Sequence, residues 1–251
     1  MSDAGVEPVS AEPPRLSGPV MMNQSWRDLT FLHWAVRPED VAHRMPPGVR
    51  PDTLHGLTYV GLIPFRMVGA GIGRGPGVPW LGSFLETNVR LYSVDATGRR
   101  GIVFLSLDAD RAAVVAGARI AFGLPYRWAR MRYARDGDVH TYDARLRRPG
   151  ARATSRVVVR SGARRRSTEL DDFVSARWGL HVRAWGRTSY VPNRHEAWPV
   201  HDAEVLSLDD ELMASVGLPG LAGRAPDHVA FSPGVRTDFG LPGNASRPRR
   251  P

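Results

Sequence analysis

The chain has 251 residues, with 34 basic and 25 acidic side chains, a formal net charge of +9 and no cysteine. Every basic residue is arginine, so no lysine amine can form a Schiff base, and no thiolate can act as a nucleophile. No apolar run approaches the 18 residues of a membrane span, and the first residues lack a secretory signal. We therefore expect a cytoplasmic protein with no membrane partner.

The positive charge is concentrated in one arginine-rich segment, residues 145–166. This segment contains nine arginines and no acidic residue, which accounts for the whole net charge. Such a segment could contact nucleic acid or another polyanion. It has no aromatic side chain on which bases could stack, so a solvated hairpin is the favoured interpretation and nucleic-acid binding the weaker one.

The first part of the chain combines a leader with two strands. Residues 1–20 are rich in Pro, Ser, Ala and Glu without periodicity, which predicts a disordered leader. Residues 23–36 alternate as a strand with both faces partly buried, and a short helix over 38–45 follows. Proline cannot donate to a ladder, so Pro64 predicts that the strand of residues 57–68 lies at a sheet edge or carries a bulge.

Residues 80–110 form the central hairpin of the predicted sheet. Its first strand places on one face Phe84, Glu86, Asn88 and Arg90. Its second strand places on one face Ile102, Phe104, Ser106 and Asp108. A face that combines a carboxylate, an amide and a guanidinium is too polar for a dry core. It is either a solvated sheet face or the lining of a ligand pocket.

The second half of the chain predicts strands interrupted by helices. Residues 111–122 form the clearest helix, with Asp110 as its N-cap and Gly123 as its C-cap, and further helices cover 168–178 and 209–216. The predicted strands cover residues 126–135, 139–148, 154–160, 181–190, 198–208 and 229–239, with turns at 149–150 and 192–193. The predicted fold is mainly β (α+β), with one antiparallel β domain over residues 21–242, about three short peripheral helices, and a disordered basic tail over 243–251.

Known catalytic and cofactor motifs are absent from the sequence. His195-Glu196 and His201 lack the HExxH spacing, and no P-loop, GxSxG or SxxK motif occurs. The glycine-rich loop of residues 69–82 never meets the GxGxxG spacing, because its glycines are two residues apart. We expect no metal and no cofactor.

The remaining candidates are polar residues on predicted strands. Glu86 and Arg90 lie about 13 Å apart along their strand, too far to pair but able to face one ligand between them. Burial would raise the pKa of the carboxyl and a nearby guanidinium would lower it, so Glu86 is a candidate general acid or base and Arg90 a candidate clamp for a carboxylate or enolate. The candidate substrate-binding residues are His33, Arg66, Asn88, Ser106 and Asp108. For each of them the alternative is an ordinary structural pair.

Five blocks in chain order resemble the DUF2071 (YqjF-like) family: NQSWRDLTFLHWAV, MPPGVRPDTLHGLTYVGLIPFRM, FLETNVRLYS, FLSLDADRAAVVAGARIAFGLPYRWARM and FSPGV. That family is similar to the acetoacetate decarboxylase-like superfamily, which implies a β-cone or double-sheet barrel around a small-molecule pocket. The resemblance implies Glu86 and Arg90 as counterparts of the superfamily's glutamate and arginine. It does not carry over the decarboxylation, which needs an imine-forming lysine that this chain lacks.

Two functions of different classes remain. The first is a cofactor-independent enzyme of lyase, isomerase or cyclase type, acting on a small oxygenated or carboxylate-bearing metabolite through Glu86 and Arg90. The alternative is a small-molecule binding or carrier protein with the same pocket and no turnover. Nucleic-acid binding through the arginine-rich segment is a third, weaker interpretation, and assembly into a homo-oligomer is left open.

Overall fold

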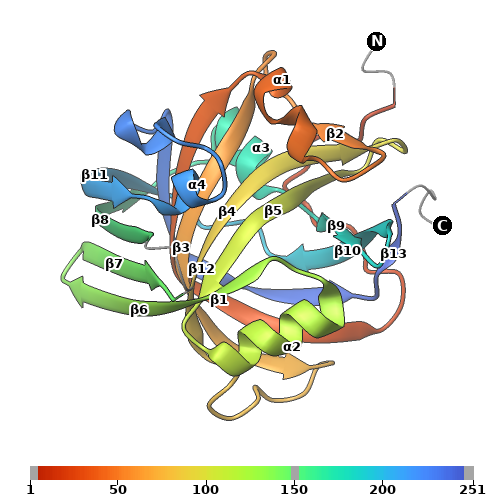
Figure 1. The fold of residues 1–251 in the computed structure, drawn as a ribbon, viewed down its shortest axis with the longest axis horizontal. Coiled ribbons are helices and arrows are strands. Elements are labelled where there is room, and N and C mark those ends of the chain that lie inside the picture. Colours follow the sequence, from red (N-terminus) through yellow and green to blue (C-terminus); the bar gives the residue numbers. More distant parts are fainter. Residues whose placement is uncertain (1–4, 148–152, 246–251) are drawn as a thin grey trace.

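The computed structural model describes residues 5–147 and 153–245, in which 13 strands form one sheet that curves into a ring (Figure 1). The strands are β1 Val20–Val36, β2 Val49–Pro51, β3 Thr58–Ile72, β4 Phe84–Asp95, β5 Arg100–Ala109, β6 Tyr126–Asp136, β7 Val139–Leu146, β8 Thr154–Arg164, β9 Gly179–Ala184, β10 Arg187–His195, β11 His201–Asp210, β12 His228–Gly240 and β13 Gly243–Asn244. The helices are α1 Pro38–Val41, α2 Ala112–Phe122, α3 Glu169–Ser175 and α4 Leu212–Ser215, with 3-10 turns at Ala42–Arg44 and Leu221–Gly223. The predicted mainly β fold with short helices is confirmed.

The strand pairings close two rings that share five strands. The first ring consists of β1, β3, β4, β5, β9, β10 and β12, because β5 pairs with both β4 and β9 while β12 pairs with both β1 and β10. The second ring leaves β5 through β6, β7, β8 and β11 and returns to β12. Strands β1, β3, β4, β5 and β12 belong to both rings, so each of them has one face in each interior.

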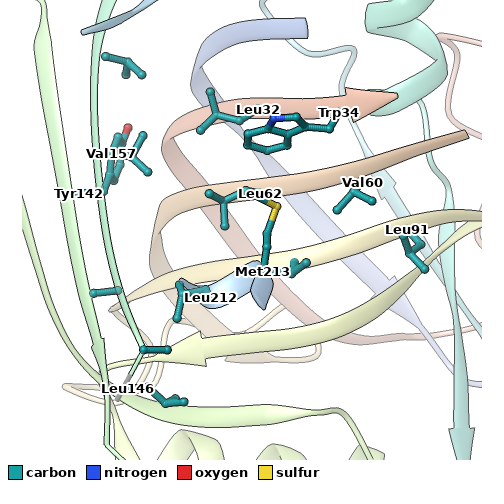
Figure 2. Packing of buried hydrophobic residues seen from close by; sticks show 14 of the residues in the cluster. Leu32, Trp34, Val60, Leu62, Leu91, Tyr142, Leu146, Val157, Leu212 and Met213 are labelled. Atoms are coloured by element: carbon teal, nitrogen blue, oxygen red, sulfur yellow. The ribbon is translucent and has the colours of Figure 1, made fainter. Parts of the chain in front are cut away.

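The second ring is filled by apolar side chains (Figure 2). Leu32 and Trp34 of β1 and Leu62 of β3 are fully buried there, and Met213 of α4 packs against them. Tyr142 of β7 closes the cluster from the opposite wall. The interior of the second ring is therefore an ordinary hydrophobic core, which stabilises the fold by removing apolar surface from water.

Strand β1 carries a bulge opposite Pro64 of β3. The register between β1 and β3 shifts between Arg27 and Leu32, and Asp28 has a left-handed φ of 48°. Pro64 of β3 lies opposite this interruption, in a strand that pairs on both sides. Of the two alternatives predicted for Pro64, an edge or a bulge, the structure shows the bulge, where a missing N–H costs no ladder bond.

Several predicted boundaries differ in the structure. Residues 192–193 lie inside β10, where Pro192 pairs with Gly179 of β9 and Asn193 with Phe239 of β12, so the predicted turn there is wrong. The chain turns instead at Trp185, which has a left-handed φ of 49°. The N-cap of α2 is Arg111 and not the predicted Asp110. The Asp110 carboxylate instead accepts a hydrogen bond from the Leu85 N–H. The predicted turn at 149–150 lies outside the described residues.

The two predicted end segments make contacts where the structure describes them. The carbonyl of Glu7 accepts a hydrogen bond from Arg100, and that of Ser10 accepts one from the indole of Trp178. At the other end, β13 pairs with β10. The domain boundaries at residues 20 and 243 stay a prediction. Within the described ranges, no helix has both the length and the apolar character needed to cross a membrane.

Candidate functional site

The first ring contains a cavity that all seven of its strands line, together with Phe122 of α2 and Tyr126 of β6. The cavity has a volume of about 100 Å³. Most of the wall is apolar, including Phe65, Phe104 and Phe239. A mostly apolar hollow with a few convergent polar groups is typical of a small-molecule site.

The predicted polar face of β4 lines this cavity. Glu86, Asn88 and Arg90 all contribute to the wall, while Val89 between them packs in the filled second ring. Of the two interpretations of this face, a solvated surface and a pocket lining, the structure therefore shows the second. The roles of these residues stay a prediction.

Glu86 is a buried carboxyl group whose charged form is disfavoured. Burial raises its pKa from an ordinary value of 4.5 to about 8, and hydrogen bonds from Tyr126 and Asn88 only partly oppose this. The Tyr126 hydroxyl donates to Glu86 Oε2 over 2.9 Å. At neutral pH the side chain is mainly a neutral carboxylic acid, which can donate a hydrogen bond or a proton into the cavity.

Asn88 presents an unpaired acceptor in the same wall. The residue is 4% exposed, and among the described residues no group donates to its Oδ1. A buried polar atom without a partner costs free energy, and an unpaired acceptor at a cavity wall is suited to a ligand that brings a hydrogen-bond donor.

Arg90 is held in place by two hydrogen bonds and two rings. Its Nε donates to the Tyr92 hydroxyl over 3.0 Å, and its Nη2 donates to the carbonyl of Val174 over 3.1 Å. The guanidinium carbon lies 5.7 Å from the centroid of Phe31 and 5.4 Å from that of Tyr92, within cation–π distance. These contacts leave Nη1 for a ligand and place one fixed positive charge at the cavity.

The prediction that Ser106 and Asp108 share the face of Phe104 is wrong. The register between β4 and β5 shifts so that Val89 pairs with Ser106 and Arg90 with Phe104, which leaves Leu105 as the extra residue of a β-bulge. Beyond the bulge it is Leu107 that lines the cavity. Asp108 instead forms an ion pair with Arg127 on the other face, with Nε–Oδ1 at 2.5 Å, and Ser106 accepts from the same guanidinium.

Neither His33 nor Arg66 lines the cavity, so the expectation that they contact its ligand directly is not met by their positions. Arg66 forms a half-exposed ion pair with Asp28, with Nη1–Oδ2 at 2.6 Å. His33 is fully buried, and its Nε2 lies 2.6 Å from the Tyr92 hydroxyl, one hydrogen bond away from Arg90.

Sequence reasoning missed Tyr126 and Tyr92. Tyr126 reaches Glu86 because β6 pairs in parallel with β5, with Tyr126 opposite Leu107. Strand alternation does not reveal a parallel partner, and the available signal was a tyrosine placed directly after the helix-ending Pro125. Tyr92 follows Arg90 on the same face of β4 and could have been found by extending that face by one pleat.

The arginine-rich segment is partly balanced by acids from other strands. Its described residues form ion pairs with carboxylates of β7, β11 and α3, namely Arg156–Asp143, Arg160–Glu204 and Arg165–Asp171. Within residues 5–147 and 153–245, no group of three or more His, Asp or Glu side chains could hold a metal ion.

Comparison with known proteins places this geometry in a fold class. Acetoacetate decarboxylase from Legionella pneumophila aligns with a TM-score of 0.57 at 14% identity, covering 96% of this chain and 95% of that one. The enduracididine biosynthesis enzyme MppR complexed with pyruvate aligns with 0.57 at 17% identity over 92% of each chain. An acetoacetate decarboxylase-like enzyme from Sphingomonas wittichii RW1 aligns with 0.58 at 12% identity over 90% and 92%. The fold is therefore of the acetoacetate decarboxylase-like type.

The family is narrower than the fold. The model of DUF2071, described as an uncharacterized conserved protein, matches residues 23–236. The uncharacterized protein YqjF of Bacillus subtilis strain 168 is 30% identical over 187 residues, which cover 73% of this chain and 76% of that protein. The chain belongs to the DUF2071 family, as the sequence blocks indicated.

Proposed function

We propose that this chain is a cofactor-independent enzyme of lyase, isomerase or cyclase type, with Glu86 as general acid–base and Arg90 as the clamp for a carboxylate or enolate. The observation that carries the proposal is the buried carboxyl of Glu86, with a pKa of about 8, in the wall of a mostly apolar cavity. Perturbed carboxyl groups in cavities are typical of catalytic acids and bases, which work best with a pKa near the operating pH.

The charges of the wall define the substrate class. At neutral pH Arg90 is the one ionised residue among the described side chains that line the cavity, because Glu86 is mainly protonated. A monocarboxylate balances Arg90, whereas a dicarboxylate would bury an unpaired charge at considerable cost. The apolar wall favours an aliphatic or aromatic body, and the unpaired Asn88 Oδ1 favours a hydroxyl or amide donor. The substrate is thus a small apolar monocarboxylate with a carbonyl or hydroxyl oxygen.

The chemistry follows from moving one proton. With the substrate carboxylate on Arg90, the ionised form of Glu86 removes a proton from a carbon next to a carbonyl group. The electron pair moves onto the carbonyl oxygen, where the positive charge of Arg90 stabilises the enolate. The protonated Glu86 then returns the proton to carbon, or gives it to a departing oxygen. The hydrogen bond from Tyr126 stabilises the ionised form during the cycle.

This route differs from imine chemistry. One solved structure of the same fold is described as MppR complexed with the condensation product of pyruvate and imidazole 4-carboxaldehyde. The present chain has no lysine at any position, so carbanion character must be stabilised as an enolate and not through an iminium ion. That same lack of lysine favours the second candidate, a carrier that binds the apolar monocarboxylate without turnover.

Deuterium exchange tests the proposal and separates the two candidates. 2-Oxohexanoate combines a carboxylate, a ketone and an apolar chain, and NMR in D₂O follows the loss of its C3 protons. The wild type should exchange them faster than buffer, with a rate that rises with pH up to about 8 as Glu86 ionises. Glu86→Gln should bind equally well and exchange about 100-fold more slowly or worse.

The matched control is Glu204→Gln on the exposed face of β11, which should exchange like the wild type. Binding without exchange by both the wild type and Glu86→Gln would establish the carrier instead. Exchange by Glu86→Gln at the wild-type rate would contradict the role of Glu86.

A further inference from the structure

A buried chain of hydrogen bonds leads from the cavity arginine to an acid on α3. It runs from Arg90 Nε to the Tyr92 hydroxyl (3.0 Å), to His33 Nε2 (2.6 Å), from His33 Nδ1 to His228 Nδ1 (2.9 Å), and from His228 Nε2 to Asp171 Oδ1 (2.8 Å). The five residues come from β1, β4, β12 and α3, and His33 and Tyr92 have no exposed surface. Because these hydrogen bonds are short and lie in the buried interior, they form one continuous structural network and not a set of incidental surface contacts.

The far end of the chain is a fixed carboxylate. Burial alone would raise the pKa of Asp171, but hydrogen bonds from His228, Arg165 and Thr168 hold it well below its usual range. The Arg165 guanidinium contacts both carboxyl oxygens, and the N–H and hydroxyl of Thr168 donate to Oδ2 in the capping box of α3. Asp171 therefore only accepts hydrogen bonds, and Arg165, which also pairs with the exposed Asp202 over 2.9 Å, opposes its charge.

The carboxylate sets the direction of every hydrogen in the chain. His228 must carry its hydrogen on Nε2 to donate to Asp171, which leaves Nδ1 of a neutral ring as an acceptor for His33 Nδ1–H. His33 then accepts the Tyr92 hydrogen at its bare Nε2. Burial, aided by the charge of Arg90, lowers the pKa of His33 well below its ordinary value, in keeping with a neutral ring.

The opposite direction leaves a hydrogen without an acceptor. If His228 were doubly protonated, His33 would donate to Tyr92 from Nε2, and Arg90 would donate to the same oxygen. The hydrogen bonds of the described residues give the Tyr92 hydroxyl no further partner, so its own hydrogen would be buried and unpaired. Only the direction toward Asp171 pairs every hydrogen and leaves the Tyr92 oxygen free to accept from Arg90.

We propose that Asp171, His228, His33 and Tyr92 form a positioning chain that fixes the guanidinium of Arg90 and makes the cavity selective for a carboxylate over a neutral group. Tyr92 holds Nε and the Val174 carbonyl holds Nη2, so the plane of the guanidinium is set before a ligand arrives. A guanidinium ordered in advance loses less entropy on binding than a mobile one. The inference rests on the proposed role of Arg90 as a clamp and is independent of turnover.

The tautomers of the two rings test the chain in the wild-type protein. Long-range ¹H–¹⁵N correlation spectra of histidine-labelled protein at pH 7 distinguish Nδ1–H from Nε2–H rings. His33 should be the Nδ1–H tautomer and His228 the Nε2–H tautomer, both neutral. A doubly protonated His228, or a His33 with its hydrogen on Nε2, would overturn the direction of the chain.

Selectivity tests its effect on binding, with hexanoate and hexanamide as matched probes. Tyr92→Phe keeps the buried ring and removes the hydroxyl, so it should weaken hexanoate about tenfold or more and leave hexanamide unchanged. The matched control is Tyr142→Phe in the filled second ring, which loses a buried hydroxyl bonded to the Asp28 carbonyl and should bind both probes like the wild type.

The outcomes separate this inference from the proposed function. A wild type that does not prefer hexanoate to hexanamide contradicts the clamp itself and overturns both. A wild type that prefers hexanoate, with a Tyr92→Phe variant that keeps the preference, overturns the positioning chain alone. The tautomer measurement needs only the wild-type chain, so it decides the matter even if Tyr92→Phe does not fold.

Discussion

The two rings of this molecule share five strands but differ in what fills them. The second ring is packed with apolar side chains such as Leu62 and Trp34, whereas the first encloses a cavity with Glu86, Asn88 and Arg90 in its wall. Strand β4 serves both, because Val89 and Leu91 face the core while Glu86, Asn88 and Arg90 on its other face line the cavity. A strand whose one face packs in an apolar core can hold energetically unfavourable polar groups on its other face. Alternate residues of β4 therefore contribute to stability and to the candidate site.

Replacing one leucine in each ring by alanine tests this difference in packing and has the largest expected effect. Leu62→Ala opens a void in the filled ring and should lower the free energy of unfolding by about 2–5 kcal/mol without changing hexanoate binding. Leu107→Ala, in the cavity wall, should cost less because its side chain already borders empty space, and should alter binding. Equal stability losses, measured by denaturant unfolding, would mean that the first ring is packed as tightly as the second.

Glu86→Gln should stabilise the protein at neutral pH. The folded state raises the Glu86 pKa from 4.5 to about 8, so its contribution to stability is fully present below pH 4.5 and is lost progressively as the pH rises from 4.5 through 8. Replacing the carboxyl by an amide removes that loss, a gain on the order of 3 kcal/mol at pH 7. Unfolding curves at pH 4 and pH 8 check the sign, and a variant that is less stable than the wild type at pH 8 contradicts it.

Gly61→Ala should displace Arg90 in the cavity wall. A Cβ at Gly61 would lie 3.1 Å from the His33 ring and 3.2 Å from Arg90 Cγ, so both side chains must shift. We expect a stability loss of about 1–3 kcal/mol together with weaker hexanoate binding by calorimetry. Gly117→Ala in α2, where nothing lies within 4 Å, is the control and should gain up to about 1 kcal/mol with unchanged binding. Binding unaffected in both variants would show that Arg90 is not held tightly.

The smallest effect is expected in the arginine-rich segment. Arg156→Ala breaks an exposed ion pair with Asp143 and should change stability by about 0.5 kcal/mol or less. Because several arginines are paired with acids, we expect weak binding to random DNA that the variant does not alter, measured by fluorescence anisotropy at low salt. Tight, steeply salt-dependent binding would instead indicate that the arginine-rich segment binds nucleic acid.

The alternation of residues along single strands could be predicted from the sequence. The bulge in β5 and the contacts between residues far apart in the chain could not. The face of Glu86, Asn88 and Arg90 could be read from the period of two in β4. The bulge at Leu105 could not, because no glycine or proline marks it, and it turned Ser106 and Asp108 away from the cavity. The pairing of His33 with His228 joins residues 195 positions apart, which only the closed ring brings together.

The pKa of Glu86 is the most direct test of the proposed acid–base role. A ¹³C NMR titration of the glutamate carboxyls, assigned by comparison with Glu86→Gln, measures the pKa of Glu86 in the intact protein. We expect a value of about 8, with a neutral carboxylic acid facing the cavity at pH 7. A value near the ordinary 4.5 would mean a solvated, charged carboxylate, and would contradict both the hollow apolar ring and the acid–base role built on it.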